Sequence, residues 1–104
     1  MQSILDKLKE NLQVIYRRAL DADEALAKLQ QGGKGKFQQV FAEDAPFTVQ
    51  SKRFAPYVEE LARDILALEQ EQDESRQQTM LQPVVRKMEL LFVTLANLQQ
   101  SLKD

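Results

Sequence analysis

The side chains in this sequence that could do chemistry are chiefly carboxylates in adjacent pairs, such as Glu59 with Glu60 and Asp73 with Glu74. Two neighbouring carboxylates can serve as a general acid and a general base, but on helices they more often form solvated faces and i,i+4 ion pairs. The sequence contains no His and no Cys, so the usual general base and the best nucleophile are both missing. We therefore expect no catalytic residue and predict that the protein is not an enzyme.

The sequence also lacks the residues that metal and nucleotide sites usually need. Zinc sites and carboxylate-bridged metal sites draw on His or Cys ligands, and the chain has neither, so we expect no metal. The run GGKGK at residues 32–36 superficially resembles a phosphate-binding loop. It lacks the first glycine of that pattern, and Phe37 stands where Ser or Thr is required. A flexible linker is the favoured interpretation, and we expect no cofactor.

A group of cations close to aromatic residues is the best candidate for a binding site. The cations are Lys34, Lys36, Lys52 and Arg53, and the aromatic residues are Phe37, Phe41, Phe47, Phe54 and Tyr57. Cations interleaved with rings can hold single-stranded nucleic acid, and they can also grip an acidic peptide with an apolar end. Alternatively, the rings cap a core and the cations are solvated. If a partner binds here, we expect its contacts to come from Phe37, Phe41, Lys52, Arg53 and Tyr57.

The bulk properties limit the classes of protein to which the chain can belong. With 104 residues it is expected to form a single domain over residues 1–104. The net charge of −2 argues against a dedicated nucleic-acid binder, because neutralising phosphates needs a clustered basic surplus. The longest apolar run, at residues 90–93, is far too short to cross a membrane. These properties favour a cytoplasmic protein.

Apolar residues near the N-terminus recur at alternating steps of three and four residues: Leu5, Leu8, Leu12, Ile15, Ala19, Ala22, Leu26 and Leu29. This repeat is typical of an amphipathic helix that packs along its whole length. Ser3 can cap the start of the helix, and Gly32 and Gly33 favour its end. We predict a helix over residues 3–31.

Two further stripes predict two more long helices. The first consists of Phe54, Val58, Leu61, Ile65 and Leu68, with Pro56 in a first turn that tolerates it. The polar run at residues 69–78 favours an exposed extension before a break. The last helix is expected to start at Thr79, which has capping-box spacing to Gln82, or at Pro83. Its stripe consists of Leu81, Val85, Met88, Phe92, Leu95, Leu98 and Leu102.

The first connection should also contain a short helix, because Phe37, Val40 and Phe41 share one helical face. The predicted fold is therefore all-α: a helical bundle of three long antiparallel helices plus one short helix in the first connection. The stripes bury most simply against one another within one chain. Alternatively, the long first helix pairs with another protein or with a second copy, so a homodimer is an open alternative.

A characteristic order of motifs runs through most of the chain. A leucine-striped segment at residues 4–29 is followed by Phe37 with Val40 and Phe41. Next comes the run FAPYVEE at residues 54–60, then a helical stripe to Leu68 and a last amphipathic helix. Over residues 4–98 this order resembles the N-terminal helical domain of the primosomal replication protein N″ (PriC) family.

The resemblance implies a part in restarting stalled DNA replication, by helping to load the replicative helicase and by contacting single-stranded-DNA-binding protein. The chain departs from the family in three places: the aromatic pair is one residue closer, Gln38 replaces a common Asp, and the segment between Phe41 and Phe54 is longer. The family's basic C-terminal half has no counterpart in this sequence. The resemblance therefore implies a protein-docking adaptor whose direct binding of nucleic acid is weak or absent.

A different role fits the same composition. Small export chaperones of the flagellar or type III secretion type are also short, acidic, helical and poor in Cys, and they are often dimers. Such a chaperone binds an amphipathic helix of its client. A dimer whose apolar groove captures a client helix would favour this alternative over the replication adaptor.

Overall fold

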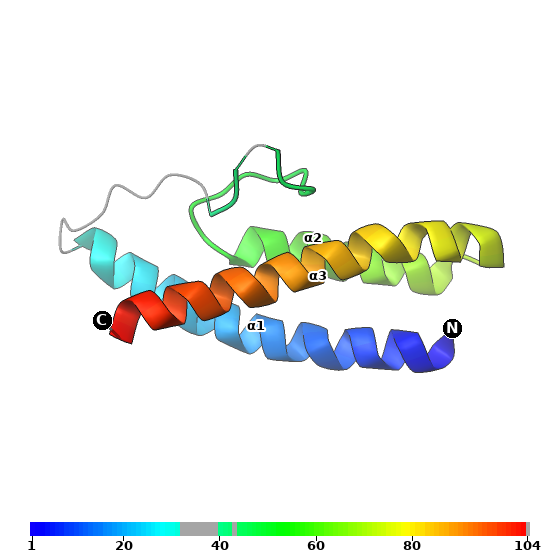
Figure 1. Ribbon diagram of the computed structural model, residues 1–104, viewed down its shortest axis with the longest axis horizontal. Coiled ribbons are helices and arrows are strands. Elements are labelled where there is room, and N and C mark those ends of the chain that lie inside the picture. Colours follow the sequence, from blue (N-terminus) through cyan, green and yellow to red (C-terminus); the bar gives the residue numbers. More distant parts are fainter. Residues whose placement is uncertain (32–39, 43, 104) are drawn as a thin grey trace.

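The computed structural model of the protein describes residues 1–31, 40–42 and 44–103. Three helices pack together in this part of the chain (Figure 1): α1 (Gln2–Gln31), α2 (Ala55–Gln70) and α3 (Glu74–Lys103). The described residues contain no strand. The prediction of an all-α helical bundle is confirmed, but the predicted number and lengths of the helices are only partly right.

The helices run up, down and up again. Lys9 of α1 forms an ion pair with Glu69 near the end of α2, and Asp23 of α1 accepts a hydrogen bond from Ala55 at the start of α2. The two helices are therefore antiparallel, and α3 turns back to run in the same direction as α1 (Figure 1). With 16 residues, α2 is about half as long as α1 and α3, which have 30 residues each.

The apolar stripe of α1 forms one wall of the core, as the sequence predicts. Six of its eight residues are buried: Leu5, Leu8, Ile15, Ala19, Ala22 and Leu26. Leu12 packs against the same cluster while staying partly exposed. On α2 the predicted stripe is also buried from Phe54 to Leu68, and Tyr57 joins it with no exposed surface.

The core face of α3 differs from the predicted one. The residues buried on this helix are Val84, Lys87, Met88, Leu91 and Leu95. Val85 is 37% exposed, and Leu81 and Phe92 are only partly buried. Two apolar rows share Met88 and Leu95, and either could face the core. The structure selects the row that brings Lys87 against carboxylates of α2.

The last helix also begins earlier than expected, and α2 ends earlier. The polar run breaks at residues 71–73, and residues 74–78 already belong to α3. Asp73 caps the new start: its Oδ1 accepts a hydrogen bond of 2.9 Å from the Ser75 amide. Pro83 lies inside α3. With the predicted start at Thr79 or Pro83, it would have been at or near the first turn.

The predicted short helix is not found in the described part of the first connection. Phe37 lies outside the described residues, whereas residues 40–42 and 44–54 contain no helix. We call these two stretches the strap. The strap folds back on itself, since the Val40 amide donates a hydrogen bond of 2.7 Å to the Ser51 carbonyl. Three further strap amides bond to side chains of the helices: those of Thr48 and Val49 to Glu60 of α2, and that of Phe54 to Asp23 of α1.

Two side-chain truncations test which face of α3 is buried in the core. Leu91→Ala removes a side chain with no exposed surface, so we expect the free energy of unfolding to fall by about 3 kcal/mol. Val85→Ala, on the predicted but exposed row, should cost less than about 1 kcal/mol. Urea denaturation of the two variants measures both values. Equal losses would contradict the observed face.

Candidate functional site

A buried ion pair joins α2 to α3 and holds the strap. Glu60 is 5% exposed and Lys87 is 7% exposed, and Lys87 Nζ lies 2.9 Å from Glu60 Oε2. Lys87 also forms an ion pair with Asp64, one turn further along α2. The Glu60 carboxylate accepts hydrogen bonds from the amides of Thr48 (2.9 Å and 3.1 Å) and Val49 (3.0 Å), and from the Thr48 hydroxyl. One carboxylate therefore ties two helices and the strap together.

The surroundings of this pair favour its charged form. Burial by itself raises the pKa of Glu60, but hydrogen bonds from Thr48, Lys87 and Val49 outweigh it and lower the pKa from 4.5 to about 2. Burial lowers the pKa of Lys87, and its bonds to Asp64 and Glu60 outweigh that effect and raise it. Both groups are therefore charged over the whole neutral range.

Three aromatic rings pack together where the strap meets α2: Phe41 and Phe47 of the strap and Tyr57 of α2. The ring centroids of Phe41, Phe47 and Tyr57 lie 4.7 to 5.0 Å from one another. Two of the three contacts are edge-to-face, the geometry that the ring quadrupole prefers. Lys87 Nζ lies 5.9 Å from the centroid of Phe47, which adds a cation–π contact to the ion pair.

The end of the strap is fixed by five hydrogen bonds. The Tyr57 hydroxyl accepts from the Ser51 amide (2.8 Å) and donates to the Ser51 carbonyl (3.2 Å). The Arg53 amide donates to the Ser51 hydroxyl (3.1 Å). The carboxylate of Asp23, on α1, accepts from the amides of Phe54 (2.6 Å) and Ala55 (3.0 Å). We call residues 51–55 the cationic corner, because the side chains of Lys52 and Arg53 are exposed on this fixed backbone.

The structure separates the residues predicted to contact a partner. Phe37 lies outside the described residues. Phe41 is 8% exposed and Tyr57 has no exposed surface, so both pack in the core, where Phe41 anchors the strap and Tyr57 contacts it from α2. Lys52 and Arg53 are neighbours on the surface. A direct contact with a partner is therefore open to Lys52 and Arg53, while Phe41 and Tyr57 would act by positioning them.

Sequence reasoning missed Glu60, Lys87 and Asp23. A signal for the first two does exist: Glu60 stands beside the apolar stripe of α2, and Lys87 stands between Val84 and Met88 on α3. Opposite charges on the apolar sides of two consecutive helices indicate a buried pair. No comparable signal marks Asp23, because its partners are 31 and 32 residues away in the sequence.

An open groove lies between α1 and α2. Its volume is about 430 Å³, and its lining is mainly apolar: Leu12, Gln13, Tyr16, Arg17, Ala55, Val58, Glu59 and Ala62. Ala55 and Ala62 are two helical turns apart on α2 and carry only a methyl group, so they leave room along that helix. The groove lies outside the predicted contact set.

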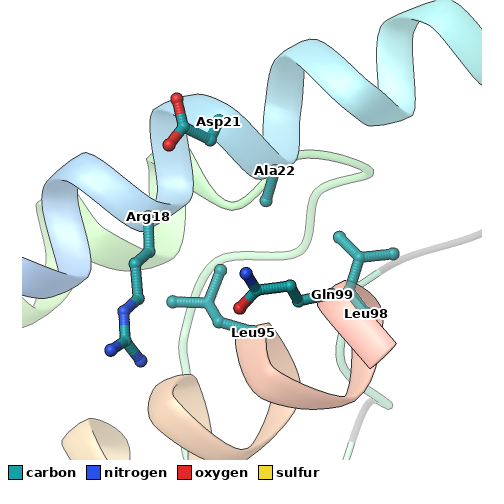
Figure 2. A pocket seen from close by; sticks show the side chains of 6 residues that line it. All are labelled: Arg18, Asp21, Ala22, Leu95, Leu98 and Gln99. Atoms are coloured by element: carbon teal, nitrogen blue, oxygen red, sulfur yellow. The ribbon is translucent and has the colours of Figure 1, made fainter. Parts of the chain in front are cut away.

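A smaller hollow of about 120 Å³ lies between α1 and α3 (Figure 2). Ala22 of α1 faces Leu95 and Leu98 of α3 across it, and the Asp21 carboxylate points away. The polar groups at its edge do not converge on one point, so the hollow offers no arrangement for acid–base chemistry.

Neither a metal-ligand group nor a membrane-crossing helix is found among the described residues. Within residues 1–31, 40–42 and 44–103, no group of three or more Asp or Glu side chains is placed to hold a metal ion. None of the helices described in the structure combines the length and the apolar character needed to cross a membrane.

Comparisons of the chain with protein-family models, with curated proteins and with solved structures find no match. The resemblance to the PriC family therefore stays a prediction based on the motifs in residues 4–98.

The Glu60 interactions predict an acid-sensitive fold. Because the pKa of Glu60 is lowered in the folded state, its contribution to stability is complete above its unfolded pKa and is lost as the pH falls from about 5 to about 2. We expect that contribution to be about 3 kcal/mol. Urea denaturation across this range, done with wild type and Glu60→Gln, isolates it as the difference between the two slopes. Parallel pH profiles would show that Glu60 is not the group responsible.

Proposed function

We propose that the protein is a non-enzymatic docking module that binds an acidic segment of a partner protein at the cationic corner. The observation that supports this most directly is the way the corner is built. Lys52 and Arg53 are exposed on a backbone that five hydrogen bonds hold in one conformation. A fixed pair of cations loses less conformational entropy on binding than a pair on a free loop.

The interactions behind the corner also favour a binding role over simple chain connection. Compared with two apolar side chains of the same shape, a buried ion pair such as Glu60 with Lys87 gains little net stability, because desolvation offsets much of its attraction. Its effect here is to fix the strap in one shape through Thr48 and Val49. A connection with no function would not need a fixed shape, since long loops are tolerated at small entropic cost.

The chemistry of the corner selects the class of partner. Two cations recognise carboxylates, and Lys52 and Arg53 are adjacent exposed cations on a chain whose net charge is −2. A short acidic peptide matches such a patch better than a nucleic acid does, because nucleic-acid affinity grows with the number of phosphates neutralised. The first contact would be steered by charge and would weaken with salt.

The resemblance to the PriC family supplies the candidate partners. The motif at residues 54–60, on which the resemblance partly rests, forms the first turns of α2 and adjoins the corner directly. We propose that the adaptor works in the cytoplasm during replication restart, and that it docks replicative helicase or single-stranded-DNA-binding protein.

The proposal predicts a charge-specific loss of binding. We expect the double variant Lys52→Glu/Arg53→Glu to bind its partner at least about tenfold more weakly than wild type, because two attractive contacts become repulsive. The measurement is fluorescence anisotropy with each of the two candidate partners, repeated at several salt concentrations.

A matched control separates the corner from the overall charge. Lys7→Glu/Arg76→Glu changes the net charge by the same amount at exposed positions of α1 and α3. It should bind as wild type does, and circular dichroism should show intact helices for both variants. Failure of wild type to bind either partner, or an equal loss in the control, would rule out the proposed site.

A further inference from the structure

One large exposed apolar residue lines the groove between α1 and α2, and two more lie one helical turn beyond its lining. Tyr16 lines the groove and is 55% exposed. Leu20 follows one turn later on α1 and is 51% exposed, and Leu66 follows Ala62 by one turn on α2 and is also 51% exposed. Such a cluster of exposed apolar side chains marks a surface that another molecule covers.

Two contacts fix the register of the helices that form this face. Lys9 pairs with Glu69 at one end, and Asp23 bonds to the Ala55 amide at the other. Tyr16 lies midway between Lys9 and Asp23, and Ala62 lies midway between Ala55 and Glu69. The most exposed large apolar side chain of α1, Tyr16, is therefore level with a methyl side chain on α2.

The charges on the two borders of the groove have opposite signs. Arg17 stands on the α1 side and Glu59 on the α2 side, and both line the groove. Among the residues that the structure describes, no ion pair joins either side chain to another residue. Arg17 and Glu59 are close to level with each other in the same register.

We propose that a second copy of this chain occupies the groove, related to the first by a twofold axis that runs parallel to α1 and α2. This rotation stacks α1 of each copy on α2 of the other and keeps every residue at its own level along the axis. Tyr16 then meets the space above Ala62 of the second copy, and Arg17 meets the second copy's Glu59. The α1–α2 pairs of the two copies form a four-helix arrangement in which all neighbouring helices are antiparallel.

The symmetry is what favours a second copy over an unrelated helix. A foreign helix would have to carry a small residue for Tyr16, an acid for Arg17 and a base for Glu59, all in the correct register. A second copy supplies all three at once, because an isologous interface pairs each border with the opposite one. Arg63 has the sign of Arg17, but it does not line the groove.

The size of the face sets the strength expected of the dimer. Its length is that of α2, about 24 Å, and its width is that of two helices, about 20 Å. Two such faces bury about 1,000 Å² in total, which is the lower end of the range for specific interfaces. We therefore expect a dimer that dissociates on dilution.

Complementary charge variants test the arrangement sharply. Arg17→Glu places acids on both borders, and Glu59→Arg places bases on both, so each variant alone should self-associate about tenfold more weakly than wild type. Mixed together, the two variants should form a heterodimer, because both of its intermolecular pairs are again of opposite sign. Sedimentation equilibrium measures all three cases. Arg86→Glu, an exposed change on α3, serves as the control and should dimerise as wild type does.

The test has clear contrary outcomes. A wild-type chain that stays monomeric at every concentration would overturn the proposal, and so would a dimer that neither charge variant weakens. Capture of a client helix by a monomer, abolished by Tyr16→Glu, would assign the groove to another protein and favour the export-chaperone role. None of these outcomes depends on the cationic corner, so the dimer and the proposed docking site succeed or fail separately.

Discussion

The charged contact between Glu60 and Lys87 determines the arrangement of the surrounding elements. Its two side chains come from α2 and α3, and the carboxylate also receives the amides of Thr48 and Val49 from the strap. A buried carboxylate without these donors would be strongly unfavourable. The buried Glu60 carboxylate needs hydrogen-bond donors and a cation. This need accounts together for the face that α3 turns to the core, the path of the strap and the packing of Phe47 over Lys87.

The helices could be predicted where the apolar pattern allowed only one answer. On α1 a single row of Leu, Ile and Ala was available, and it is the row that is buried. On α3 two rows were available, through Val84 and Leu91 or through Val85 and Phe92, and periodicity has no means of choosing between them. The choice is made by the partners of Lys87 on α2, which is tertiary information. The start of α3 was missed because a polar run that favours helix does not reveal where it breaks.

The candidate site was predictable only at the level of composition. The sequence marked a region where cations and rings are close together, and in the structure Lys52 and Arg53 of that region are exposed. The sequence could not show that the rings are buried while the cations are exposed. Phe41 and Tyr57 are buried by contacts with Phe47 that arise only when the strap folds back. The groove between α1 and α2 depends on the register of two helices joined by a long connection, and no local motif encodes that register.

The unequal connections have a consequence for how the chain reaches this structure. Only residues 71–73 separate α2 from α3, whereas α1 and α2 are separated by residues 32–54. Closing a short loop sacrifices less chain entropy than closing a long one, and contacts between near neighbours in sequence form faster. We expect α2 and α3 to pair first in folding. The late arrival of α1 would then complete the core and bring Asp23 to the cationic corner, so the corner would be among the last features to take shape.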